Sequence, residues 1–443
     1  MSERNSTAST VPHSEAKQDA SHLANWQWVD RSVWSDRMLA ALVNGVKGRK
    51  WFSLIDKVYR PTTLASAWLQ VYGNQGAAGV DQQSVSRFAS HAERYLDELQ
   101  ADLAAERYCP QAVRRVEIPK GNGKTRPLGI PTVKDRIVQT AVKRVIEPIF
   151  EHEFLPMSYG FRPGKGCKDA LRDVDEALKV GMTWVVDADL QGYFDSIPHD
   201  RLMARVEERI SDGRVLALLK RWLTQDIVSE MNRWSPTAGT PQGAIISPLL
   251  ANLYLHPLDQ EMTQGGYRMV RYADDFVILC HSEHDARQAL AHVQEWVAAN
   301  GLTLHPDKTQ IGDCRQRGQG FDFLGYRFEA GRRWVRKKSL KAFKDKVRSK
   351  TRRTEGKSLQ QVIASLNPIL RGWFGYFRHA YRTTFQPLDG FIRRRLRAML
   401  RKQERRPGRG NTLSDMRRWS NMFFANAGLF TLERAWRQAS QSR

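Results

Sequence analysis

Two adjacent carboxylates interrupt two short apolar runs in M-V-R-Y-A-D-D-F-V-I-L-C, residues 269–280. Each run has the length of a β-strand and is rich in residues that favour strands, so the stretch predicts a hairpin with Ala273, Asp274 and Asp275 at its turn. Two acids would then lie at the rim of a sheet. An ionised carboxylate is costly to bury unless a cation or hydrogen-bond donors compensate. An Asp-rich turn is also ordinary turn chemistry, so this stretch alone leaves both interpretations open.

A second group of acids lies upstream in W-V-V-D-A-D-L-Q-G-Y-F-D-S-I, residues 184–197. An apolar strand carries Asp187 and Asp189 two residues apart, which places both side chains on one face. The chain then turns at Gly192 and continues to Asp195. Taken alone, this stretch could also be a strand that ends in a helix cap.

Basic turns precede both groups of acids. The stretch R-R-V-E-I-P-K-G-N-G-K-T-R-P-L-G-I-P, residues 114–131, predicts two strands joined by a Gly-Asn-Gly turn. Lys120 and Arg126 flank that turn, where cations could reach the phosphates of a nucleotide, although a solvated hairpin tip is the plainer interpretation. G-F-R-P-G-K-G-C, residues 160–167, predicts a Gly-rich turn before a helix and lacks any nucleotide-loop consensus.

Periodicity and turn residues predict further elements. The helices are expected at 62–72, at 133–150 and, after a Gly-Pro turn, within 238–255. A Gly-rich loop is expected at 73–81, a loop that carries Lys308 at 301–309, and a single alternating strand with a glycine kink at 321–328.

The net charge of +23 is concentrated in one block, residues 331–410, which we call the basic arm. It holds 25 Lys and Arg against four Asp and Glu, or +21, which leaves +2 for the rest of the chain. Apolar residues recur at helical spacing among these charges, as in Leu359, Val362, Ile363 and Leu366. Folded basic helices favour a polyanionic partner, and nucleic acid is the leading candidate.

Length and composition set the remaining bounds. The 443 residues, 41% of them hydrophobic, suffice for two to three domains with a substantial core. No apolar run approaches the roughly 18 residues of a membrane span, and the polar start of the chain lacks the apolar centre of a signal peptide. The four cysteines form no C-x-x-C pair, so we expect them to be reduced and partly buried.

These parts together favour two-metal phosphoryl transfer. Divalent cations such as Mg²⁺ prefer carboxylate oxygens, and two ions about 4 Å apart can activate a 3′-hydroxyl and stabilise a leaving pyrophosphate. Other chemistries have less support, because the histidines are scattered and neither a nucleophile elbow nor a G-x-x-x-x-G-K-[ST] loop is present.

The order of the motifs also carries a family resemblance. Y-A-D-D, preceded by D-A-D-L-Q-G-Y-F-D and P-Q-G, resembles the palm of a reverse transcriptase. With K-G-N-G-K-T-R-P-L-G-I-P, G-F-R-P-G-K-G, H-P-D-K-T and F-L-G-Y, the stretch from about 64 to 328 resembles the group II intron-encoded reverse transcriptase/maturase family. L-N-P-I-L-R-G-W-F-G-Y-F, residues 366–377, resembles its maturase or thumb domain, and residues 418–430 resemble its small DNA-binding tail.

The resemblance implies an α+β right-hand polymerase fold, with fingers and an antiparallel palm sheet followed by an α-helical thumb/maturase domain. The expected divisions are a disordered tail (1–24), a helical N-terminal extension (25–61), fingers and palm (62–330), a basic helical thumb (331–410) and a short DNA-binding-like tail (411–443).

The family pattern makes Asp189, Asp274 and Asp275 the catalytic carboxylates. These three and Leu190 would bind two Mg²⁺ ions, for which Mn²⁺ could substitute. Asp189 and Asp274 would bridge the metals with Asp275 in support, whereas Asp187 and Asp195 are expected to be structural.

The same pattern assigns the nucleotide-binding residues. Lys120 and Arg126 match finger residues that contact the incoming triphosphate, and Lys308 would assist the pyrophosphate.

Tyr193 matches the aromatic gate that rejects a 2′-hydroxyl by occupying the space which that group would need. Gln242 and Gly243 would shape the nucleotide and template side.

The basic arm is expected to bind RNA without chemistry, so that the intron keeps its active fold while the RNA catalyses its own splicing. The residues expected to contact RNA are Arg371, Arg378, Arg382, Lys337, Lys338, Arg393 and Arg394. Trp373, Phe374, Tyr376 and Phe377 are expected to pack between helices rather than stack on bases.

One departure from the longest family members concerns the end of the chain, which follows Phe430 by 13 residues. We therefore expect no Cys-rich H-N-H endonuclease domain and no second-strand cleavage. Priming would then use a nascent strand at a replication fork or another nick.

The expected function is RNA-directed DNA synthesis, with a maturase role in splicing and support of retrohoming by target-primed reverse transcription. The expected partners are group II intron RNA, an RNA template with a DNA primer, target DNA and deoxynucleoside triphosphates, without a membrane; no oligomeric state is predicted. We expect a cytoplasmic, nucleoid-associated ribonucleoprotein of a bacterium. Two alternatives are a maturase that binds RNA without polymerising and a domesticated reverse transcriptase of DNA repair or phage defence. Intact Asp189, Asp274 and Asp275 count against the first, and an intron RNA flanking the gene would decide the second.

Overall fold

The computed structural model describes residues 26–121, 124–230 and 232–441. The expected disordered tail (1–24) and the Asn-Gly of the turn at 122–123 lie outside these residues. No helix in the described part of the chain has the length and hydropathy needed to cross a membrane.

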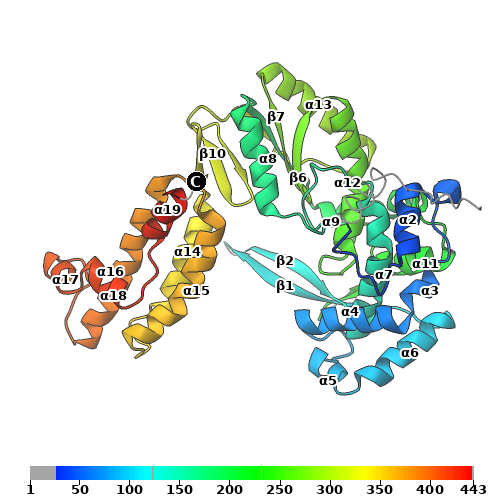
Figure 1. The fold of residues 1–443 in the computed structure, drawn as a ribbon, viewed down its shortest axis with the longest axis horizontal. Coiled ribbons are helices and arrows are strands. Elements are labelled where there is room, and N and C mark those ends of the chain that lie inside the picture. Colours follow the sequence, from blue (N-terminus) through cyan, green and yellow to red (C-terminus); the bar gives the residue numbers. More distant parts are fainter. Residues whose placement is uncertain (1–25, 122–123, 231, 442–443) are drawn as a thin grey trace, which may run out of the picture.

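A central antiparallel sheet organises the chain (Figure 1). Its strand order is β6 (Arg268–Tyr272), β7 (Asp275–Cys280), β3 (Trp184–Asp189) and β8 (Gln310–Asp313). Tyr272 pairs with Asp275, so β6 and β7 form the predicted hairpin around a two-residue turn, with Asp275 as the first residue of β7.

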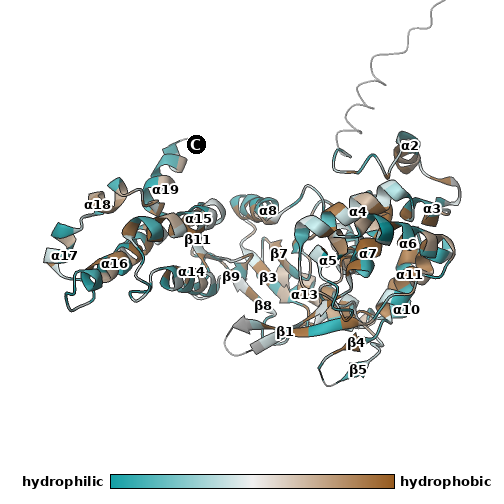
Figure 2. Cartoon of the chain, turned by 90° about the horizontal axis from the view of Figure 1, so that it is seen from below, coloured by the Kyte–Doolittle hydropathy of each residue, from teal (hydrophilic) through white to brown (hydrophobic). Residues whose placement is uncertain are grey.

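Both faces of the central sheet are buried because its side chains alternate between two hydrophobic cores. Val186 and Phe276 belong to the larger core, whereas their neighbours Val185 and Val277 belong to the second core. Figure 2 shows the resulting hydrophobic colour on β3 and β7.

Two helices of the larger core, α12 (Ser247–Gln264) and α13 (Glu283–Ala299), pack on one face of the sheet. In the same core α7 (Val133–Glu151) and α10 (His199–Glu207) contact α12, and α11 (Gly213–Leu223) contacts α10. The N-terminal helices α2 (Asp36–Asn44), α3 (Ile55–Val58), α4 (Pro61–Asn74), α5 (Val85–Ala89) and α6 (Ala92–Ala104) and the 3₁₀ turn η1 (Lys47–Arg49) precede them. The helices predicted at 62–72 and 133–150 are thus confirmed as α4 and α7, and α7 begins where the Thr132 hydroxyl accepts a hydrogen bond from Asp135 N.

A second sheet carries a long two-stranded ribbon. Its order is β2 (Lys124–Ile130), β1 (Val113–Gly121), β4 (Ile227–Val228) and β5 (Arg233–Trp234), and we call it the ribbon sheet. β1 and β2 are antiparallel and project toward the side on which the C-terminal helices lie (Figure 1). The two strands predicted at 114–131 are therefore confirmed.

A small sheet follows the central sheet and corrects one prediction. Residues 321–328 are not a single kinked strand, because β9 (Phe321–Phe323) and β10 (Tyr326–Glu329) pair antiparallel as a hairpin. Leu324 (φ 46°) and Gly325 (φ 83°) both adopt left-handed backbone at its tight turn, which the alternating pattern did not reveal. β11 (Arg332–Val335) completes the sheet, so the basic arm begins with a strand rather than a helix.

The helices α14 (Lys337–Lys350), α15 (Leu359–Phe377) and α16 (Phe385–Gln403), with the 3₁₀ turn η2 (Arg382–Thr384), form the rest of the arm. The short helices α17 (Leu413–Arg418), α18 (Asn421–Asn426) and α19 (Leu432–Gln441) follow. The aromatic residues of α15 pack as predicted: Trp373 stacks on Phe343 with ring centroids 4.4 Å apart, and Phe377 is buried. Hydrophilic residues mark much of α14 and α16 in Figure 2.

Candidate active site

The carboxylates predicted to be catalytic meet at one end of the central sheet. Asp189 ends β3 and Asp275 begins β7, and these two residues are directly opposite each other in the antiparallel register. Asp274 occupies the turn that leads into β7. Asp189 and Asp275, which are 86 positions apart in sequence, are thus brought side by side.

Burial and mutual repulsion make this group of acids electrostatically costly. Burial, followed by the negative charges of Asp187, Asp274 and Asp189, raises the pKa of Asp275 to about 7. Burial also raises the pKa of Asp274, and the charge of Asp189 adds to that effect, while Lys308 and Arg271 oppose it. Ionised acids that repel one another at a partly buried site favour a bound cation.

Asp187 lies on the same strand face, two residues before Asp189. Its pKa is raised to about 6, mainly by burial and then by the charge of Asp322, against the effect of a hydrogen bond from the Gln310 amide. Asp187 therefore adds negative charge to the site from a position two residues before Asp189 on β3.

The carboxylates at this end of the sheet suit hard divalent cations that are also bound by the phosphates of a substrate. Among the residues that the structure describes, no three Asp, Glu, His or Cys side chains already surround a common point. Mg²⁺ is usually held by one or two carboxylates, with water and substrate phosphates as the other ligands. Leu190 has an apolar, buried side chain, so only its main-chain carbonyl could serve as a ligand.

The loop that carries Lys308 is tied directly to the end of β3. His305 N donates to Asp189 O at 2.8 Å, and Gln191 N donates to Thr303 O at 2.8 Å. The Lys308 ammonium forms an ion pair with the Asp189 carboxylate. The structure thus places Lys308 in the site, next to a carboxylate predicted to be catalytic.

The loop that contains P-Q-G, residues 241–243, packs against strand β2 of the ribbon sheet, and we call it the P-Q-G loop. Gly129 N donates to Gln242 O at 2.6 Å. A side chain at Gly243 would place its Cβ 2.4 Å from Gly129 O, and the φ of Gly243 is +110°. Only glycine fits at this position without displacing the backbone. Gln242 and Gly243 therefore fasten this loop to the ribbon sheet.

Two predicted contacts with the triphosphate lie on the ribbon. Arg126 is exposed and is paired with Ile118 across the ribbon. Lys120 belongs to β1, but its side chain lies outside the described part of the chain.

Tyr193 is not placed as the predicted sugar gate. Its side chain is only 2% exposed, and its hydroxyl donates to Ala251 O at 2.6 Å. A residue that rejects a 2′-hydroxyl must contact the sugar, and the ring of Tyr193 is instead packed in the larger core. The next residue, Phe194, is only partly buried.

A buried polar network fixes the turn that carries Asp274, and sequence reasoning did not find it. Arg271 on β6 and Asp259 on α12 form an ion pair in which both side chains are fully buried. Arg271 Nη1 also donates to Ala273 O at 2.9 Å and to Asn252 Oδ1 at 3.0 Å. The one sequence signal of this network is that Arg271 directly follows the apolar residues Met269 and Val270 within β6.

The turn at 160–167 packs against the same hairpin. Asn252 Nδ2 donates to Gly160 O at 2.7 Å. A Cβ on Gly160 would lie 2.3 Å from Ala273 N, so the backbone of this turn touches the backbone beside Asp274. The glycine allows a close approach that the weak phosphate-loop pattern did not suggest.

The residues predicted to bind RNA lie on the basic arm, whose helices α14 to α16 are apart from the central sheet (Figure 1). The start of the arm is nearer the acids, because the charge of Arg336 lowers the pKa of Asp275. Lys337 and Lys338 begin α14 with exposed side chains, and Arg394 on α16 is also exposed, whereas Arg393 is half-buried. Arg371, Arg378 and Arg382 are exposed as well. Arg371 lies over the ring of Phe430, with its guanidinium carbon 5.0 Å from the centroid.

Sequence comparisons give two family matches. The family described as "Reverse transcriptase (RNA-dependent DNA polymerase)" matches residues 118–328, and "Group II intron, maturase-specific domain" matches residues 340–419.

Among curated relatives, Protein YkfC of Escherichia coli K12 is 33% identical over 346 residues, which cover 69% of this chain and 86% of that protein. The group II intron-encoded protein LtrA of Lactococcus lactis is 36% identical over 208 residues, or 46% of this chain and 34% of LtrA. An uncharacterized 91 kDa protein in the cob intron of Schizosaccharomyces pombe is 28% identical over 367 residues, or 64% of this chain and 45% of that protein. The chain thus spans less than half the length of the last two relatives.

Proposed function

Because this chain belongs to the family of group II intron-encoded reverse transcriptases and maturases, we propose that it copies RNA into DNA at the end of the central sheet and binds intron RNA through the basic arm. RNA-directed DNA polymerase activity and a maturase role are the functions of this family. The assignment of each role to particular residues is our proposal.

One observation carries the catalytic part of the proposal. Asp189 and Asp275 are opposite each other in register, with Asp274 in the adjoining turn, and burial together with the repulsion of the neighbouring acids raises the pKa of Asp275 to about 7. Clustered acids of this kind repel a polyanionic substrate unless cations are bound, so the arrangement suits metal-dependent nucleotidyl transfer better than RNA binding alone.

We assign the metal-holding groups to Asp189, Asp274, Asp275 and the main-chain carbonyl of Leu190. When bound, two Mg²⁺ ions would supply charge stabilisation to the attacking 3′-hydroxyl and the leaving pyrophosphate, and Mn²⁺ could substitute. The Lys308 ammonium balances the charge of Asp189 and can contact the departing pyrophosphate.

The ribbon sheet supplies the groups that hold the incoming deoxynucleoside triphosphate. Arg126 and Lys120 bind its phosphates, and the docked loop at Gln242 and Gly243 keeps the ribbon beside the carboxylates. We propose Phe194 as the residue that contacts the sugar. Its main chain is fixed because Thr240 N donates to Phe194 O at 2.6 Å.

The maturase role requires binding and no chemistry on the protein. The exposed cations of α14 to α16 bind phosphates of the intron RNA and hold it in its active fold. We further propose that the protein supports retrohoming at a target DNA by target-primed synthesis, and that it acts in a ribonucleoprotein associated with the bacterial nucleoid.

Primer extension tests the polymerase assignment. The purified protein with Mg²⁺ and deoxynucleotides should extend a DNA primer on an RNA template, and Asp189→Asn should lower the rate by at least a hundredfold with unchanged RNA binding. A wild-type protein that binds RNA but extends no primer would overturn the proposal and identify a maturase without polymerase activity.

A further inference from the structure

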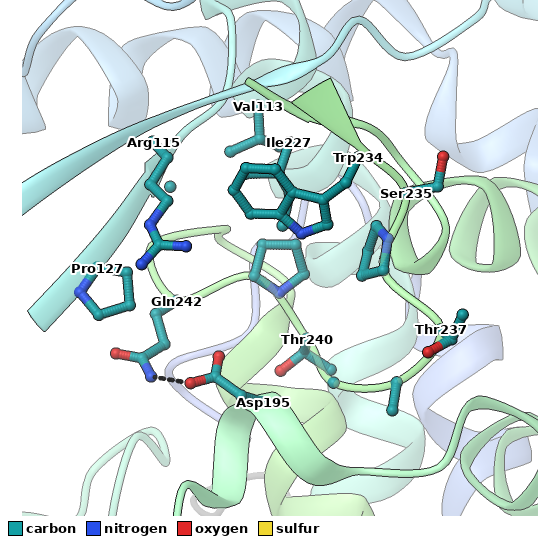
Figure 3. Close-up of a pocket in the computed structure, with 15 residues that line it drawn as sticks. Val113, Arg115, Pro127, Asp195, Ile227, Trp234, Ser235, Thr237, Thr240 and Gln242 are labelled. Atoms are coloured by element: carbon teal, nitrogen blue, oxygen red, sulfur yellow. Dashed lines mark hydrogen bonds between the residues drawn. The ribbon is translucent and has the colours of Figure 1, made fainter. Parts of the chain in front are cut away.

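A cavity of about 420 Å³ opens where the ribbon sheet meets the P-Q-G loop (Figure 3). Arg115 and Pro127 belong to one face of the ribbon, because Arg115 pairs with Gly129 and Glu117 pairs with Pro127. Arg126 pairs with Ile118 and therefore faces the opposite side. The cavity is thus separate from the face that we assign to the triphosphate.

The walls of the cavity combine flat apolar groups with a few polar ones. Trp234 on β5 provides an aromatic ring, and the guanidinium carbon of Arg115 lies 5.5 Å from its centroid. Val113, Ile227 and Pro241 add apolar surface. Figure 3 shows Arg115 and Trp234 on either side of the opening, with Gln242 and Asp195 together below them.

Two polar features point to a ligand. Thr240 lines the cavity, is only 2% exposed, and its hydroxyl has no hydrogen-bond partner among the described residues. A buried hydroxyl without a partner is costly unless something else supplies the bond. At the floor, Gln242 Nε2 donates to Asp195 Oδ2 at 3.2 Å, so the cavity is linked to both the docked loop and the segment that follows Asp189.

This chemistry matches a nucleobase. Bases stack on aromatic rings and on arginine planes, and their edges accept and donate hydrogen bonds. A free nucleoside triphosphate fits less well, because Arg115 is the one cation in the lining and Asp195 would repel several phosphates. A base within a strand brings one phosphate per nucleotide, which Arg115 can contact in exchange for its present ion pair with Glu117.

We propose that this cavity binds an unpaired base of the RNA template ahead of the position being copied. The inference rests on the proposed polymerase function, since a polymerase must hold the unpaired template strand close to the groups that hold the incoming nucleotide. Trp234 stacks on the base, Arg115 contacts its phosphate, and the Thr240 hydroxyl bonds to the base edge. Because every base has a flat face, the site accepts all four bases.

The test compares primer–template duplexes whose RNA overhang has one nucleotide or five. Fluorescence anisotropy measures the affinity for each duplex, and single-nucleotide incorporation is measured on the same samples. The wild type should bind the longer overhang roughly tenfold more tightly, which is the size expected of one base–aromatic stack. Trp234→Ala should reduce this ratio to less than twofold, and Trp234→Phe should restore most of it.

Arg233→Ala is the matched control, because Arg233 precedes Trp234 on β5 and pairs with Asp226 outside the cavity. It should leave the ratio unchanged. If Trp234→Ala does not fold, two other experiments replace it. One uses the variant Thr240→Val, and the other uses the wild type with a 2-aminopurine base at the second position of the overhang. A stacked 2-aminopurine should lose fluorescence on binding, and Thr240→Val should lower the affinity ratio.

Two outcomes would overturn the proposal: a wild type that gains no affinity from the longer overhang, or a folded Trp234→Ala that keeps the full gain. Failure of the wild type to incorporate a nucleotide on either duplex would instead refute the polymerase function. The two failures are therefore distinguishable.

Discussion

At the scale of single residues, the burial of Asp275 beside other acids lowers the stability of the metal-free protein and favours the binding of a cation. Its pKa is raised to about 7 by burial and by the neighbouring acids, compared with the ordinary carboxyl value of 3.8. The native state therefore binds a proton that the unfolded chain has already released between pH 4 and 7. Stability must then fall as pH rises through this window in metal-free protein.

Asp275→Asn should therefore stabilise the metal-free protein at pH 8 by about 1 to 3 kcal/mol, because it removes a buried negative charge. It should also flatten the fall in stability between pH 5 and 8. Urea denaturation at both pH values measures these changes, with Asp200→Asn, an exposed acid on α10, as the control. A destabilised Asp275→Asn at pH 8 would contradict this electrostatic explanation.

Phe194 and Tyr193 provide a second test at this scale. Phe194→Ala should raise incorporation of ribonucleotides relative to deoxynucleotides by at least tenfold, because it opens the space beside the sugar. Tyr193→Phe removes only a buried hydroxyl that donates to Ala251, so it should lower stability by about 1 kcal/mol and leave this discrimination unchanged. Single-nucleotide incorporation measures both ratios. If Tyr193→Phe alone altered sugar discrimination, the original sequence-based assignment would be restored.

At the scale of elements, the hairpin β6–β7 is held by the buried pair Arg271–Asp259 as well as by its own hydrogen bonds. Asp259→Leu should cost about 3 to 5 kcal/mol, because it leaves the buried charge of Arg271 without its carboxylate partner. Arg271→Met combined with Asp259→Leu should recover much of that stability. The double variant still lacks the donor to Ala273 O, so its incorporation rate should remain at least tenfold below wild type.

Thermal denaturation and single-nucleotide incorporation on the same three proteins separate the two effects. A double variant that is stable and fully active would show that Arg271 stabilises the fold without positioning the turn.

The same elements show what sequence could predict. The hairpin at 269–280 followed from two short runs of strand-favouring residues around a turn, and helix α7 followed from helical periodicity; both signals depend on local chain geometry. The hairpin within 321–328 did not, because its turn relies on left-handed backbone at Leu324, a residue that rarely adopts it. The docking of Gly160 and Gly243 and the pairing of Arg271 with Asp259 depend on tertiary contacts, so no local pattern marks them.

The identities of Asp189, Asp274 and Asp275 came from family resemblance, and the structure adds that they are adjacent. The role of sugar gate was assigned to the wrong residue, Tyr193. Family resemblance aligns the motif, but it does not show which of the two neighbouring aromatic side chains, Tyr193 or Phe194, points into the core.

At the scale of the whole molecule, the acids that we propose to be catalytic and the helices of the basic arm lie in different parts of the fold, and Arg336 at the start of the arm is the residue whose charge reaches Asp275. The carboxylates lie at the end of the central sheet, whereas most of the net charge lies on the arm. Substitutions on one surface should therefore leave the activity of the other surface intact.

Lys337→Glu combined with Lys338→Glu should weaken binding of intron RNA and make its salt dependence shallower. The slope of log affinity against log salt should change by about 0.7 to 2, because each lost phosphate contact removes a fixed increment. Arg287→Glu is the control, since this exposed arginine on α13 is paired only with Glu283 in the same helix. An unchanged slope in the double variant would mean that the start of α14 does not contact RNA.

The separation of the two surfaces is tested most directly by Asp274→Ala, with primer extension and intron RNA binding measured on one preparation of folded protein. We predict that extension falls by at least a thousandfold while RNA affinity stays within twofold of wild type. Equal loss of both activities, or extension at the wild-type rate, would contradict this account.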